Sequence, residues 1–110
     1  MATLTRTLGL MGAKYVASNA FTTASVLNRL SMHHNLQVRI AVADNENTSA
    51  FTSMQLAKDA SADLRYAIAE NHHVHRSILD FLTKDINPFV ADRAQKTILR
   101  LKKEIAKLIL

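Results

Sequence analysis

The chain has 110 residues but no cysteine, only two glycines and a single proline. Without cysteine it can form no disulfide, no thiolate metal site and no thiol nucleophile. Tight β-hairpin turns depend on glycine, so two glycines are too few for a multi-stranded β protein. Alanine, leucine, lysine and arginine are frequent, and all four favour helices. We therefore predict an all-α fold, a small multi-helix bundle.

The sequence also lacks a long apolar run. No segment approaches the roughly 18 to 20 apolar residues that a membrane-spanning helix needs, and the apolar stretch within residues 3–11 is too short and too polar for a secretory signal. We therefore expect an intracellular, cytoplasmic protein, and we do not expect binding to a membrane.

Acidic residues are missing from the first part of the chain. Residues 1–43 contain four basic residues and no acid, residues 44–92 contain four basic and eight acidic residues, and residues 93–110 contain six basic residues and one acid. The net charge is +5. Segregated charge of this kind favours contact with an anionic partner, or between oppositely charged parts of two copies.

Residues 1–110 are expected to form one helical domain with three parts. Residues 1–35 form a basic helical arm, residues 36–86 a central segment, and residues 87–110 an amphipathic basic helix. In the arm, an apolar face at helical spacing is formed by Leu4, Leu8, Met11 and Tyr15.

Residues 36–43 follow a different pattern, because apolar residues alternate with others at Leu36, Val38, Ile40 and Val42. A period of two is typical of a half-buried strand. No second alternating run is present, so a strand here would pair with its copy in another subunit. The alternative, that residues 36–43 are helical, remains open.

Helical spacing returns from about residue 49, as one long helix or as two helices broken near Asn71. His75 falls on the apolar face, where a lone histidine is usually buried and neutral. Glu70 and His73 have the Glu-x-x-His spacing of di-iron bundles, but those bundles need a second such pair. We therefore predict no metal site and no cofactor.

Asn87-Pro88 predicts the start of a final helix, since asparagine is a strong N-cap and proline suits the first turn. One face of this helix is apolar, and Ile98, Leu101, Ile105 and Leu108 keep the alternating three and four spacing of a coiled-coil seam. The opposite face carries Arg93, Lys96, Arg100, Lys103 and Lys107.

These features favour a non-enzymatic assembly or adaptor protein that forms a homo-oligomer or binds a protein partner. The four seam residues would form the protein interface, and the basic residues would border it. No serine-hydrolase, phosphate-loop, dinucleotide or metalloprotease motif is present, so we predict that the protein is not an enzyme and assign no catalytic residue.

The alternative is a small DNA-binding regulator. One strand followed by helices, over residues 36–83, resembles the ribbon-helix-helix repressors. The resemblance implies that Gln37 and Arg39 read bases from a paired ribbon in the major groove. Independently, the basic face of the last helix would contact nucleic-acid phosphates, through Arg93, Lys96, Arg100, Lys103 and Lys107.

Overall fold

Seven α-helices and no β-strand make up the part of the chain that the computed structural model describes, which is the backbone of residues 3–109 and the side chains of residues 9–109. The helices are α1 (Thr3–Ser18), α2 (Ala24–Leu30), α3 (Leu36–Asp44), α4 (Ala50–Leu56), α5 (Ala62–Ala69), α6 (Arg76–Leu82) and α7 (Pro88–Ile109). The predicted all-α fold is confirmed. Residues 1, 2 and 110 of the expected domain lie outside the described residues.

The helices form a repeat of 26 residues that the pattern of apolar residues did not reveal. One set of N-cap residues, at this interval, precedes α2, α4 and α6: Thr23, Ser49 and His75. A second set, at the same interval, precedes α3, α5 and α7: Asn35, Ser61 and Asn87. In the second set each side chain accepts hydrogen bonds from backbone N–H groups at the start of its helix. The repeating unit is thus a pair of helices joined by a short turn, and the pairs are α2–α3, α4–α5 and α6–α7.

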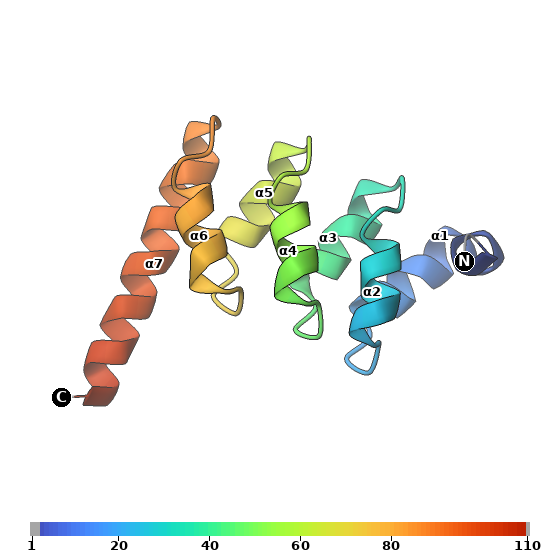
Figure 1. Ribbon diagram of the computed structural model, residues 1–110, viewed down its shortest axis with the longest axis horizontal. Helices are drawn as coiled ribbons and strands as arrows, with labels where there is room; N and C mark the ends of the chain where they lie inside the picture. The colour runs from blue at the N-terminus through green and yellow to red at the C-terminus, as the bar shows by residue number, and fades with distance from the viewer. Residues whose placement is uncertain (1–2, 110) are drawn as a thin grey trace.

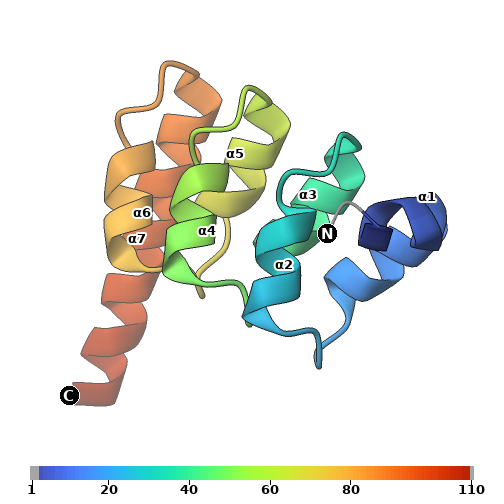
Figure 2. The same ribbon diagram turned by 45° about the vertical axis from the view of Figure 1, so that its right-hand side comes forward.

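The pairs stack side by side into a short solenoid. Helices α2, α4 and α6 form one layer, and α1, α3, α5 and α7 form the other, with α1 at one end and α7 at the other (Figures 1 and 2). Within the second layer each helix contacts the next in chain order. Each pair buries its apolar face against its neighbours, as in repeat proteins generally.

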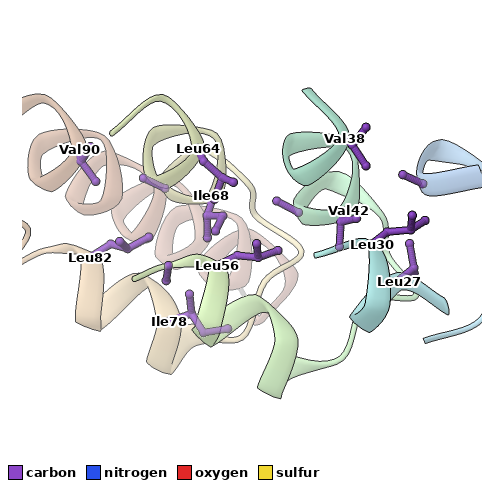
Figure 3. Close-up of a cluster of buried hydrophobic side chains, with 14 of the residues drawn as sticks. Leu27, Leu30, Val38, Val42, Leu56, Leu64, Ile68, Ile78, Leu82 and Val90 are labelled. Atoms are coloured by element: carbon purple, nitrogen blue, oxygen red, sulfur yellow. The ribbon is translucent and has the colours of Figure 1, made fainter. Parts of the chain in front are cut away.

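The core runs continuously through this stack and repeats with it (Figure 3). The first helix of each pair contributes a buried leucine, and these are Leu30, Leu56 and Leu82. The second helix has two buried apolar positions that repeat in all three pairs, filled by Val38 and Val42, Leu64 and Ile68, and Val90 and Ala94. The same positions thus pack the same interface three times.

Helix α1 supplies half of a further pair. Gly9, with φ of 63°, interrupts α1 and stands 26 residues before Asn35, so residues 10–18 take the place of a second helix. Ala13 and Ala17 are its buried residues, whereas Met11 and Tyr15 are 83% and 69% exposed. The expected apolar face at Met11 and Tyr15 is therefore wrong, and the side chains of Leu4 and Leu8 lie outside the described residues.

Residues 36–43, for which the sequence leaves strand and helix both open, are helical and belong to α3. Asn35 caps it by accepting hydrogen bonds from the backbone N–H groups of Gln37 and Val38. The alternation is misleading because α3 lies in the middle of the stack, where helices cover several of its sides. Leu36 and Ile40 are half-buried while Val38 is fully buried, so apolar residues are needed around most of the helix and not only on one stripe.

The central segment likewise differs from the expectation, because residues 50–83 contain three helices, α4, α5 and α6. His75 is exposed, and it occupies the N-cap position of α6 and contacts the hydroxyl of Ser77. Its predicted burial was wrong because the helix breaks before it, which ends the helical phase that had placed it on the apolar face.

Two arginines clamp successive pairs together. Arg39 on α3 donates through Nε and Nη2 to the carboxylate of Asp59, which lies in the turn of the next pair, at 3.0 and 3.3 Å. Arg65 on α5 likewise donates through Nε and Nη2 to the carboxylate of Asp85, at 2.9 and 3.2 Å. Each Nη1 also donates to two backbone carbonyls of its own pair's turn. One guanidinium therefore ties two neighbouring turns.

A second contact repeats at every junction of the second layer. Asn45 donates through its amide to the carbonyl of Ala17, and Asn71 donates to that of Ala43. At the last junction the hydroxyl of Thr97 donates to the carbonyl of Ala69 at 2.6 Å. Each bond satisfies a carbonyl near a helix C-terminus, where intrahelical partners run out.

Removing one partner of a buried clamp leaves the other charge unpaired. The Arg65 and Asp85 side chains are only 12% and 6% exposed, so Arg65→Ala should lower the free energy of unfolding by about 3 kcal/mol in urea denaturation. The matched control is Arg76→Ala, whose partner Asp80 lies on the same helix and whose side chain is 49% exposed. That change should cost less than about 0.5 kcal/mol, and equal losses would contradict the clamp.

His33 occupies the place that Asp59 and Asp85 hold in later pairs. Its Nδ1 accepts the backbone N–H of Asn35, as the two carboxylates accept those of Ser61 and Asn87. Burial lowers the pKa of His33, and the charges of His34 and Arg39 lower it further. For Asp85, burial acts to raise the pKa, but hydrogen bonds from Arg65 and the Asn87 backbone and the charge of Arg65 outweigh it, so the pKa is lowered.

The His33 shift predicts a pH dependence of stability. An unfolded chain protonates this imidazole near its ordinary pKa of 6.5, while the folded chain resists protonation. The contribution of His33 to the free energy of unfolding is therefore fully present above pH 6.5 and is lost as the pH falls toward the folded pKa, by at most about 1.4 kcal/mol per pH unit. Substituting His33→Asn, which keeps an acceptor, should flatten this slope in thermal melts, whereas exposed His72→Asn should retain it.

Candidate interaction surface

Helix α7 begins where the sequence predicted. The side-chain oxygen of Asn87 accepts the backbone N–H groups of Phe89 and Val90, and Pro88 occupies the first turn. The helix then extends over 22 residues, compared with nine in α3. Its first half completes the last pair, and its second half continues past α6 and beyond the stack (Figures 1 and 2).

The continuation has a local cause at Thr97. In earlier pairs this position holds Asn45 or Asn71, and the helix stops there because asparagine competes for backbone hydrogen bonds. Thr97 keeps the bond to the preceding pair without ending the helix. The following residues include Leu99, Arg100 and Leu101, which favour helix. We call residues 99–109 the projecting segment.

The predicted seam is divided by the end of the stack. Ile98 is 7% exposed and belongs to the protein's own interior, and Leu101 is half-buried. Ile105 and Leu108 are 54% and 87% exposed. The structure therefore gives Ile98 an intramolecular role and leaves the outer seam uncovered within the described chain.

The predicted basic residues also fall into groups. Lys96 pairs with Asp92 on the same helix, with Nζ 2.9 Å from the carboxylate. Arg93 is half-buried and Arg100 is exposed, and both line a recess against the end of α5. Lys103 and Lys107 are exposed on the projecting segment.

Gln37 and Arg39 do not form the base-reading surface that the ribbon-helix-helix resemblance implied. Gln37 is exposed near the start of α3, and the guanidinium of Arg39 is held by Asp59 and by two backbone carbonyls. Because residues 36–43 are helical, no ribbon forms, and the expected base reading by Gln37 and Arg39 is corrected.

Sequence reasoning missed a polar recess of about 220 Å³ between α5 and α7. It is lined by Glu70, His72, Arg93, Thr97 and Arg100. Arg93 Nε is shielded from solvent, and among the described residues it has no hydrogen-bond partner. The 26-residue repeat could have revealed that Arg93 is unusual, because the equivalent positions in the two earlier pairs are Ala41 and Ala67.

No protein-family model, curated protein or solved structure matches the chain. Within residues 3–109, no helix combines the length and the apolar character that crossing a bilayer requires. The side chains described for residues 9–109 include no cluster of three or more histidine, aspartate or glutamate residues arranged to hold a metal ion.

Proposed function

We propose that this protein is a non-enzymatic assembly protein that self-associates through the projecting segment of α7. The observation that supports the proposal is the exposure of Ile105 and Leu108 on a regular helix that leaves the stack. Ile109, on the same side of the segment, is 76% exposed. Apolar side chains gathered in this way are typical of a contact surface.

The magnitude of burial favours two reciprocal contacts over one. Covering a leucine or isoleucine fully contributes about 2 kcal/mol, so Ile105, Leu108 and Ile109 of one segment together contribute about 4–6 kcal/mol. Association costs about 4–15 kcal/mol in lost freedom. In a two-fold dimer both segments are buried and the favourable contribution doubles to about 8–12 kcal/mol, which is comparable with that cost.

Charge favours a particular surface for this contact. The segment is basic, with Lys103 and Lys107 exposed, whereas Asp44, Glu46 and Glu70 gather at the ends of α3 and α5. Partial burial raises the pKa of Asp44, and the negative charge of Glu70 raises it further. These acids crowd one edge of the stack, so a cationic helix from a second copy would relieve their repulsion.

The same edge also offers a place for an apolar side chain. Glu46 borders a cavity of about 190 Å³ whose wall includes Ala43, Val74 and Ile78. An apolar side chain of the seam entering this cavity would be surrounded by apolar groups while the neighbouring lysines approach the acids. Such an anchored side chain is the usual centre of a stable interface.

The double variant Ile105→Asp/Leu108→Asp tests self-association. Both side chains are exposed, so folding should be unaffected, while the new carboxylates oppose burial of the seam. We expect the mass from light scattering to fall to that of one chain, with helicity unchanged.

The matched control is Ile86→Asp, because Ile86 is 96% exposed but lies before α7 and far from the projecting segment. This variant should keep the mass of the native protein. A native protein of one-chain mass at high micromolar concentration would overturn self-association, as would a double variant that retains the larger mass.

A second candidate is nucleic-acid binding by the projecting segment. Arg100, Lys102, Lys103 and Lys107 are exposed there, and within the described side chains none of the four lies within 4.0 Å of a carboxylate. Unpaired cations on one helix suit phosphate contacts without base reading.

Salt dependence distinguishes this candidate. Four phosphate contacts predict that duplex DNA affinity falls about a hundredfold between 50 and 200 mM salt. Lys103→Gln should weaken binding to all sequences alike and lower the slope by about one. Absence of DNA binding at 50 mM salt, measured by fluorescence anisotropy, ends this candidate and leaves self-association intact.

A further inference from the structure

Arg93 has an unused hydrogen-bond donor in an otherwise well-paired chain. Its Nε is shielded from solvent, and the described residues supply it with no acceptor. A buried donor without a partner costs free energy, and such groups in native structures call for an explanation such as a bound ion. Arg93 also lines a recess between α5 and α7.

The two arginines that link successive pairs show what this donor does when an acceptor is present. Arg39 and Arg65 both use Nε together with Nη2 to hold the two oxygens of one carboxylate. This side-on fork matches the geometry of carboxylate and phosphate oxygens. Arg93 has the same fork, but no carboxylate lies within 4.0 Å of it among the described side chains.

The surroundings of Arg93 are those of an anion site. Arg100 lies two turns further along α7, on the same side, and lines the recess with Arg93. His72 contributes a polar ring from the loop after α5. Thr97 also lines the recess, and its hydroxyl already donates to the carbonyl of Ala69. The recess therefore offers two guanidinium groups to a ligand of about 220 Å³ or less.

Glu70 is the one acidic side chain in the lining, and it does not occupy the fork. Its carboxylate lies within ion-pair distance of neither Arg93 nor Arg100. Its negative charge also contributes to the raised pKa of Asp44. The positive charges of Arg93 and Arg100 thus outnumber the single negative charge of Glu70, and the lining of the recess has a net positive charge.

We propose that the recess between α5 and α7 binds a small oxyanion, a phosphate or carboxylate group, through the guanidinium groups of Arg93 and Arg100. Glu70 limits the affinity by repulsion. The site goes beyond self-association, because it uses the side of α7 that faces α5, while the seam uses Ile105 and Leu108.

Nuclear magnetic resonance tests the site directly through the Arg93 Nε–H signal. The full chain is titrated with sodium phosphate, and separately with sodium acetate, at constant ionic strength maintained with sodium chloride. Saturable movement of the Arg93 signal supports the site. The anion that saturates at lower concentration identifies whether phosphate or carboxylate is the preferred ligand.

Three variants give the test its specificity. Arg93→Lys keeps the charge but removes the paired guanidinium donors. Because charge-assisted paired hydrogen bonds are among the strongest hydrogen bonds in proteins, the dissociation constant should rise about tenfold or more. In this variant the backbone signals of Thr97 and Arg100 report binding. Glu70→Gln removes the repulsion and should tighten binding severalfold. Lys103→Gln, which removes an exposed charge elsewhere on α7, should change the constant less than about twofold.

Two results overturn the proposal. One is the absence of saturable movement for both anions in the native chain and in Glu70→Gln. The other is equal weakening by Arg93→Lys and Lys103→Gln, which would reveal general attraction to a basic helix. Neither result bears on self-association, which is measured by mass and disrupted at Ile105 and Leu108.

Discussion

The guanidinium clamp between neighbouring pairs is the contact on which the register of the stack depends. Apolar packing alone is tolerant of sliding, because leucine and valine contacts have no direction. The fork of Arg39 on Asp59 and that of Arg65 on Asp85 are directional, and each also holds carbonyls of the preceding turn. A shift of one pair along its neighbour would leave buried charges unpaired.

The clamp also explains how the two ends differ from the middle. The position that holds Arg39 and Arg65 is Ala13 in α1 and Ala91 in α7. The carboxylate position that would face Ala13 holds His33, which keeps the backbone hydrogen bond without needing a cation. Repeat proteins usually carry altered terminal units, since these have a neighbour on one side only.

Helix α7 combines two roles because its sequence changes character at Thr97. Up to Ile98 it is the last member of the second layer, with Val90 and Ala94 in the shared core. Beyond Leu101 every described side chain of α7 is exposed, yet the three and four spacing of apolar residues continues to Leu108. An amphipathic helix of this kind is marginal alone, which is the physical reason to propose a second copy as its cover.

The sequence alone determined the all-α class, the start of α7 at Asn87-Pro88 and the amphipathic faces of that helix, because caps and helical periodicity are local properties. The tertiary structure decided what α3 is and which side chains are free. Residues 36–43 alternate like a strand because helices surround α3 on several sides. Arg39 is paired with Asp59, Ile98 is buried and the Arg93 Nε lacks an acceptor. Each of these depends on neighbours that are distant in the sequence, and the spacing of residues along the chain does not record those neighbours.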